Sequence, residues 1–344
     1  MSRPILRISR ARFRENIAAV QRRIEPSVLM LVMKDDAYGH GLGWAVEEAA
    51  DAGVSWFGGY DIPTALRIRR LSERGRILAW ATSTDSEIAE ALLHDIDLGI
   101  GTTEYLGRVI GHARALGRSA RVHLKIDTGL RRNGVLPADW DAFVAQARAA
   151  EDDGALEVVG VWSHLSEASD AEDDASQAVF VEAVDAVRRA GGAPELLHLT
   201  ASAASWWRPE LRGSISRIGA FCYGIRSAEG PELEGIRPIA SLTAPVVGIA
   251  GGDAIIGIGS FDGLPSTLGG IEVGTPAGPR VLRLVDQTTS VVAGWSGMEP
   301  GEQVTLFGPG DDGEQSATTL AEHIGTVGEE ILTRLTPRVR RVVV

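Results

Sequence analysis

Short apolar runs alternate with amphipathic stretches along the chain from residue 27 to about residue 225. Apolar runs of this length bounded by Gly and polar residues predict buried strands, and apolar positions that recur every three or four residues predict helices. Eight strands are expected here, over 28–33, 56–59, 77–80, 98–101, 122–126, 158–163, 196–199 and 218–223. Helices are expected between them, for example over 45–52, 63–71, 138–149 and 176–190.

Eight strands separated by helical stretches are typical of an α/β fold, the parallel (β/α)8 barrel of the TIM type. In such a barrel the functional side chains lie at the carboxyl ends of the strands. Lys34, Lys125, His164 and Arg217 all fall near the ends of predicted strands. These four residues are therefore candidates for chemistry at the barrel mouth.

After about residue 235 the pattern changes to short Gly-rich and Val-rich runs, which predict antiparallel strands joined by turns. The runs cover 242–250, 254–258, 280–285, 290–293 and 304–307, and a helix is expected over 317–324. We therefore expect the barrel to occupy residues 9–235 and a mainly β C-terminal domain to occupy residues 236–344.

Composition narrows the class of partner. The 344 residues favour two domains over one small core. A net charge of −12 without a basic cluster argues against nucleic acid and favours a small neutral or zwitterionic substrate. No apolar run is long enough for a membrane span or a secretory signal, so we expect no membrane contact and a cytoplasmic protein. The single cysteine, Cys222, excludes internal disulfides and is expected to be an inert core residue.

Lysine is almost absent. Of the 34 lysine and arginine residues, only Lys34 and Lys125 are lysines, and the rest are arginines. Arginine serves wherever a plain positive charge suffices, but a guanidinium does not lose its proton to attack a carbonyl carbon. An amine at the end of a buried strand has a lowered pKa and suits Schiff-base chemistry. The alternative is a compositional bias against lysine that spared two surface positions.

Lys34 lies in the motif VMKDDAYGHG at residues 32–41, which resembles the lysine motif of the alanine racemases, the fold type III enzymes of pyridoxal phosphate (PLP). Further matches follow in the family's order along nearly the whole chain. They are LKIDTGLRRNG at 124–134, WSHLSEASD at 162–170, HLTASAA at 198–204, SRIGAFCYGI at 216–225, IGSFDGLP at 258–265, VDQT at 285–288 and TRLTPRVRR at 333–341. The resemblance implies that residues 1–8 form an N-terminal strand of the β domain.

The resemblance also implies how the cofactor is held. Lys34 matches the lysine that binds PLP as a Schiff base and then moves the substrate α-proton. Tyr38 matches a tyrosine that hydrogen-bonds the phosphate, although an aromatic plug in the barrel mouth is the alternative. Ser202 and the backbone amides of Gly219 and Ala220 match the rest of the phosphate cradle, where small residues could alternatively serve only packing.

A second group matches residues around the cofactor ring and the substrate. Arg217 matches an arginine that faces the pyridine nitrogen and, because it keeps its own proton, leaves that nitrogen unprotonated. His164 and His198 match supporting histidines, with ordinary hydrogen-bonded core histidines as the alternative. Arg132 matches the arginine that contacts the phenolic oxygen and the substrate carboxylate. Lys125 matches a lysine that some members carry as a carbamate, and a plain surface lysine is its alternative.

The sequence departs from the family where the substrate is handled. The family places a tyrosine from the partner subunit opposite the lysine, and Ser260 occupies that slot, with Phe261 beside it. Residues 224–344 contain no tyrosine that could replace it. Serine without an adjacent histidine is a poor base near neutral pH. Val285, preceded by Leu284, replaces part of the usual Cys-Met pair beside Asp286, so a remodelled substrate pocket is expected.

Glu329 stands where the family usually places a second phosphate-binding tyrosine. A carboxylate repels a phosphate, so Glu329 is expected to point away or to pair with an arginine.

Three functions follow from these matches and departures. The first is an alanine-racemase-like racemase or epimerase with an altered pocket, in which Asp262, Asp286 or a bound water supplies the second acid. The second is one-faced chemistry at Cα by Lys34 alone: aldol cleavage, hydroxymethyl transfer or decarboxylation. The third is a non-catalytic PLP-binding protein. The family resemblance implies a head-to-tail homodimer for any of them.

Overall fold

The structure is a computed structural model that describes residues 3–344. The chain divides into two compact units. One unit holds residues 20–34 and 49–219, and the other holds the rest of the described chain. Residues 220–235 therefore group with the C-terminal strands, whereas the sequence pattern places them at the end of the barrel.

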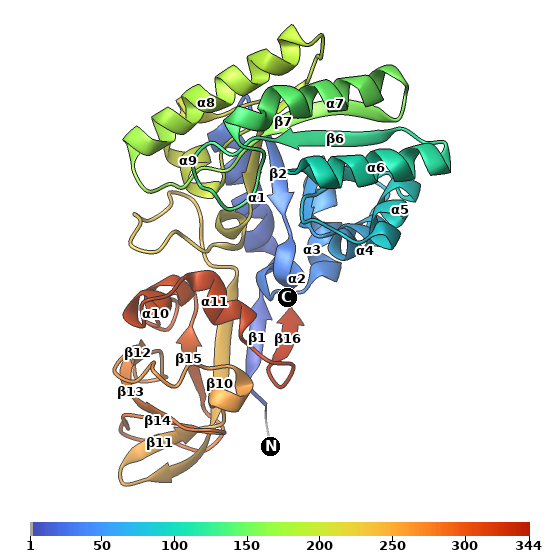
Figure 1. Cartoon of the computed structure of the whole chain (residues 1–344). Coiled ribbons are helices and arrows are strands. Elements are labelled where there is room, and N and C mark those ends of the chain that lie inside the picture. The colour runs from blue at the N-terminus through green and yellow to red at the C-terminus, as the bar shows by residue number, and fades with distance from the viewer. Residues whose placement is uncertain (1–2) are drawn as a thin grey trace. The chain divides into compact units, whose positions relative to one another are not determined.

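The first unit is built around eight parallel strands, as predicted, in the order β8-β7-β6-β5-β4-β3-β2-β9 (Figure 1). Their side chains are largely buried because helices cover the outer face of a parallel sheet. The strands are β2 Val28–Val32, β3 Trp56–Tyr60, β4 Arg76–Ala79, β5 Asp97–Ile100, β6 Ala120–Lys125, β7 Leu156–Trp162, β8 Leu196–His198 and β9 Ile215–Ile218.

Within the described residues no backbone ladder joins β8 to β9, so the barrel is nearly but not fully closed. Side-chain bonds of Ser214 bridge this gap instead. Its hydroxyl accepts from the Leu197 amide at 2.8 Å and donates to the Glu195 carbonyl at 3.1 Å. A Cβ on Gly213 would lie 2.0 Å from the Leu197 carbonyl oxygen, so the approach of the two strands requires glycine at this position.

Helices follow the strands and begin at side-chain caps. Asp61 caps α4, and Thr84 with Glu87 forms a capping box on α5. Figure 1 shows α6, α7 and α8 along the outer side of β6 and β7. The helices that follow barrel strands in the sequence are α3 Leu42–Asp51, α4 Ile62–Leu71, α5 Asp85–Leu93, α6 Thr103–Leu116, α7 Trp140–Asp152, α8 Asp170–Arg189 and α9 Ser202–Trp207.

Two predicted elements need correction. The strand predicted over 218–223 is β9, which ends at Ile218, and the buried residues of Ala220–Tyr223 form a 3-10 turn. An apolar run shows burial but does not by itself show strand geometry. The helix predicted from residue 176 begins at Asp170, because Ser169 caps it and acidic residues of its first turn face the positive end of the helix dipole. The acidic residues at 170, 172, 173 and 174 therefore lie in the first turns of this helix.

The second unit carries a sheet in the order β12-β13-β14-β11-β10-β1-β16, with β15 paired to β10. Strand β1 (Ile5–Ile8) pairs with both β10 and β16, so the N-terminal strand joins the β structure as expected. The remaining elements are α1 Arg10–Ile24, β10 Ala240–Ala250, β11 Asp253–Ile256, η4 Ser260–Asp262, β12 Glu272–Val273, β13 Arg280–Val285, β14 Ser290–Val292, β15 Gln303–Phe307, α10 Ala317–His323, α11 Gly328–Thr333 and β16 Arg340–Val343. The sequence pattern did not reveal β12, β16 or α11, which are short or frequently interrupted by polar residues.

Candidate functional site

Lys34 follows the last residue of the buried strand β2, Val32, by two positions and begins a left-handed turn, Lys34–Tyr38. Asp35, Asp36, Ala37 and Tyr38 all have φ between 53° and 56°. Left-handed geometry costs an L-residue roughly 1–2 kcal/mol. Four such residues in succession mark a strained segment of the kind found at functional sites.

Tyr38 ends this turn with its side chain buried. Burial raises the pKa of its phenol, and the negative charges of Glu329 and Asp35 add to the rise. Its ring lies 5.1 Å from the ring of Tyr223. The hydroxyl therefore keeps its proton at neutral pH and can donate to an anion, as its predicted role requires.

Arg217, on β9, is buried and donates to groups on neighbouring strand ends. Its Nη1 donates to the His198 carbonyl at 2.8 Å and lies 3.0 Å from His198 Nδ1. Its Nη2 donates to the carbonyls of Ser163 at 2.7 Å and Leu199 at 3.2 Å. Burial lowers the pKa of Arg217 to about 9, which leaves the guanidinium charged at neutral pH.

The fixed charge on Arg217 determines the tautomers of two buried histidines. Because a guanidinium only donates, Nδ1 of His198 must accept, and its Nε2–H then donates to Nδ1 of His123 across 2.8 Å. The Nε2–H of His123 in turn points to Oδ2 of Asp97, 3.3 Å away. Burial lowers the pKa of both imidazoles, so both rings are neutral links in a one-way chain of donors.

Asp97 closes this chain on β5 with a fully buried side chain. Arg76 Nη2 and Arg121 Nε each lie 2.7 Å from one of its oxygens. Burial alone would raise the pKa of Asp97, but the hydrogen bond from His123 and the two guanidinium charges outweigh burial and lower it. Asp97 is therefore an anion that the histidine pair connects to Arg217.

Four cationic side chains surround His164. Burial and the charges of Arg217, Arg132, Lys125 and Lys34 lower the pKa of His164 to about 3. Its Nδ1 lies 3.3 Å from Arg217 Nη2 and so accepts, which leaves Nε2–H as a donor. Neutral His164 cannot take up a proton near pH 7, and the four cations suit an anionic cofactor together with a substrate carboxylate.

Lys125 is buried, so the surface alternative for it is wrong. Its Nζ lies 4.5 Å from the centroid of the Trp162 ring, and the guanidinium carbon of Arg217 lies 5.1 Å from that centroid. Burial and the charges of Arg217 and Arg132 lower the pKa of Lys125 to about 8. Trp162 therefore holds two cations of the site by cation–π contacts.

Ser202 begins α9, and its Oγ lies 3.4 Å from the backbone nitrogen of Gly219, which donates to it. The hydroxyl and the amide that the sequence assigns to one phosphate cradle thus lie together. Ala220 follows Gly219 directly as the first residue of the 3-10 turn Ala220–Tyr223. The fully buried side chain of His198, on β8, lies behind this segment against Arg217.

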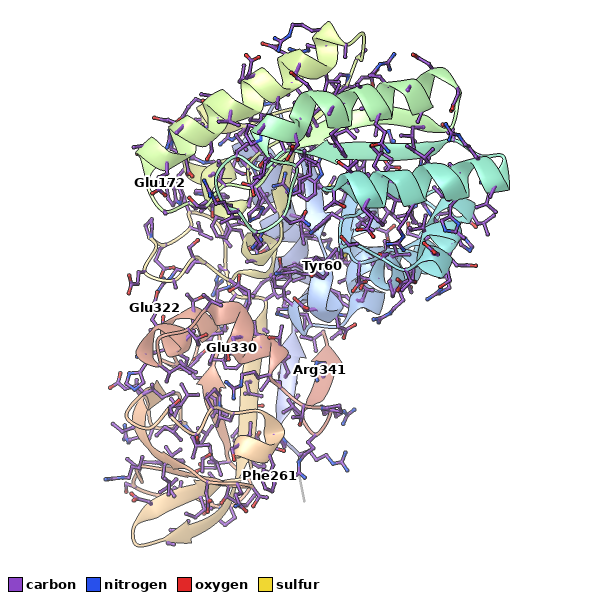
Figure 2. All side chains as sticks on the ribbon, in the orientation of Figure 1. Tyr60, Glu172, Phe261, Glu322, Glu330 and Arg341 are labelled. Atoms are coloured by element: carbon purple, nitrogen blue, oxygen red, sulfur yellow. The ribbon has the colours of Figure 1, made fainter. Side chains whose placement is uncertain are left out.

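Ser260 and Phe261 lie in the short turn η4, which is fixed by backbone bonds to residues 286 and 287. A Cβ on Gly259 would lie 2.5 Å from the Asp286 carbonyl oxygen, so this turn requires glycine before Ser260. Phe261, which is labelled in Figure 2, is 54% exposed and lines a hollow of about 860 Å³ with Thr288 and Arg338. The backbone thus presents Ser260 and an aromatic neighbour in a rigid frame.

Three residues near the turn of Ser260 determine which carboxylate could serve as the second acid of the reaction. The Asp262 carboxylate is buried, accepts from the Gly259 amide at 2.9 Å and pairs with Arg338 at 2.8 Å. It is committed to the turn, which weighs against its suggested role as an acid. Val285 is buried, whereas Asp286 at the end of β13 is exposed. Asp286 is therefore the more accessible of the two carboxylates.

Sequence reasoning missed Asp97, His123 and Trp162. Asp97 and His123 interrupt apolar strand runs, and a buried polar side chain needs a hydrogen-bond partner. Their positions could therefore have indicated a buried polar contact. Their pairing depends on the register of β5, β6 and β8, which the pattern does not give.

The donor chain predicts a specific proton arrangement. We expect long-range ¹H–¹⁵N NMR spectra to show both His123 and His198 as neutral Nε2–H tautomers between pH 6 and pH 8. Asp97→Asn should perturb both rings, whereas His94→Gln at an exposed site should perturb neither. An Nδ1–H tautomer of His198 would contradict the chain.

The pKa of Lys125 predicts a pH-dependent stability. Its folded pKa of about 8 lies below its ordinary 10.5, so the buried charge destabilises the fold below pH 8, and this cost declines as pH rises from 8 to 10.5. Lys125→Met should therefore raise the free energy of unfolding at pH 7 by about 2 kcal/mol and by less at pH 10. Urea unfolding at both pH values measures this. An equal difference at the two pH values would contradict it.

Comparison with known proteins agrees with this geometry. The sequence model of the alanine racemase N-terminal domain matches residues 8–227, and that of the alanine racemase C-terminal domain matches residues 253–343. Alanine racemase of Thermobifida fusca is 36% identical over 95% of this chain and 94% of its own length. Alanine racemase of Salinispora tropica is 34% identical over 96% and 95%, respectively.

Solved structures agree as well. The crystal structure of alanine racemase from D-cycloserine-producing Streptomyces lavendulae has a TM-score of 0.92 and 30% identity, and covers 100% of this chain and 97% of that one. Alanine racemase from Streptomyces coelicolor has a TM-score of 0.91 and 32% identity, with 99% and 98% covered. These relatives are PLP-dependent isomerases, and the residues around Arg217 fit that cofactor. The chain belongs to the alanine racemase family, and it is a PLP-dependent amino-acid isomerase.

Proposed function

We propose that this protein racemises a small amino acid, with alanine as the first candidate, at a site formed by Lys34, Arg132, His164 and Arg217. PLP, when bound, withdraws electrons from Cα and so acidifies the α-proton of the amino acid. The observation that supports the proposal is the buried Arg217, which is charged at neutral pH and is held by the strand-end carbonyls and by His198. A guanidinium fixed in this way can donate to a ring nitrogen without giving up a proton.

Each residue has a proposed task. Lys34 holds the cofactor and then removes or returns the α-proton on one face of the substrate. Arg132 binds the substrate carboxylate with its planar pair of donors. Tyr38, Ser202 and the amides of Gly219 and Ala220 hold the phosphate.

The second face of the substrate lacks the family's tyrosine. Serine at position 260 is a poor base, the Nε2–H of neutral His164 can only donate, and Asp262 is engaged with Arg338. We propose that Asp286 or a bound water moves the proton on this face. Phe261 and Val285 shape a pocket that differs from the family's usual one.

We further propose a head-to-tail homodimer in which the turn 259–263 of one copy serves the barrel mouth of the other, with the cytoplasm as its compartment. The racemase relatives support this assembly. None of the helices within residues 3–344 is long and apolar enough to cross a membrane.

Similarity to racemases does not favour the two alternatives, one-faced chemistry at Cα and a non-catalytic PLP carrier. One-faced chemistry predicts exchange of the α-proton with retention, and a carrier predicts no exchange. Racemisation predicts exchange together with inversion.

The missing tyrosine predicts a gain of function. In deuterated water, L-alanine should exchange its α-proton and yield D-alanine, and Ser260→Tyr should raise the inversion rate by about tenfold or more, because general acid–base catalysis contributes at least that much. Proton NMR and chiral chromatography measure exchange and inversion. Ser260→Phe is the matched control, because it adds the ring without the hydroxyl and should give no gain. Equal inversion rates for the Ser260→Tyr and Ser260→Phe variants would contradict the proposed role of position 260.

A further inference from the structure

Glu167 lies three residues after His164 in a conformation that non-glycine residues rarely adopt. Its φ is 54°, in the left-handed region. Its backbone amide donates to Asp173 Oδ1 at 3.2 Å, and its own Oε1 accepts from the backbone amide of Ala204 at 2.8 Å. The residue is exposed overall, and the second bond ties its carboxylate to the backbone of α9.

The partner of this carboxylate is on the segment proposed to bind phosphate. Ala204 follows Ser202 by two residues on α9, and Ser202 accepts from the Gly219 amide at 3.4 Å. The start of α9 therefore binds the Glu167 carboxylate at Ala204 and is proposed to bind the cofactor phosphate at Ser202.

The charge on Glu167 reaches the site. Its carboxylate raises the pKa of Arg217 against the larger lowering effect of burial. Burial raises the pKa of Glu167 itself, although the Ala204 amide opposes this rise. A carboxylate placed here repels any second anion that is held on the same segment.

We propose that Glu167 opposes the cofactor phosphate and so determines how tightly PLP is held. The proposal rests on the proposed PLP function and deepens it. Its consequence is that this protein gains less affinity from the phosphate group than its cradle of donors would otherwise provide. Glu167 is thus an affinity-determining residue rather than a catalytic one.

The test compares dissociation constants of PLP and of pyridoxal, which lacks the phosphate, by titrating the apoenzyme and following absorbance of the Schiff base. Glu167→Gln keeps an acceptor for the Ala204 amide and removes the charge, so folding should be preserved. It should tighten PLP binding about three- to tenfold and leave pyridoxal unchanged. Glu167→Ala should tighten PLP in the same direction.

Glu172→Gln is the matched control. Glu172 is an exposed residue in the first turn of α8, labelled in Figure 2, and its side chain accepts from Ser166 at 3.3 Å. Its substitution removes the same charge and should change neither constant. The inference is overturned if Glu167→Gln leaves PLP binding unchanged or weaker, or tightens PLP and pyridoxal equally. Absence of any Schiff base in the unaltered protein would overturn the proposed function as well, which separates the two failures.

Discussion

Arg217 brings a positive charge into the barrel interior, and the surrounding groups are arranged around that charge. Isolated burial of a guanidinium is costly, so it must be met by acceptors. Three backbone carbonyls and two imidazole nitrogens meet it here. The Nδ1 atoms of His198 and His164 are thereby fixed as acceptors, and His123 continues the hydrogen-bond chain from His198 to Asp97. Without Arg217 the tautomers of this chain would be undetermined.

The same charge explains the chemistry proposed for the mouth of the barrel. A donor that keeps its proton leaves a facing ring nitrogen unprotonated, which limits how far negative charge spreads into the cofactor. Nearby Lys125 and Arg132 make the region electropositive and keep His164 neutral. The site therefore attracts anions strongly, and Glu167 is the carboxylate that opposes this attraction from the loop after β7.

The strands could be predicted from the sequence because each is a short apolar run, and the barrel follows from their number and spacing. The lysine at the end of β2 and the serine at position 260 could be identified from motifs with fixed spacing. The link from Asp97 through His123 to His198 could not, because it depends on the register of three strands. The role of Glu167 also escaped prediction, since an acidic run in a sequence usually indicates a solvated surface.

The most direct test is the ¹⁵N chemical shift of the pyridine nitrogen in the holoenzyme reconstituted with ring-labelled PLP. The account predicts the shift of an unprotonated nitrogen that accepts a hydrogen bond from Arg217, and it predicts no change between pH 6 and pH 8, where Arg217 stays charged. A shift typical of a protonated pyridinium would contradict the account, because it would require an acid where the structure has a guanidinium.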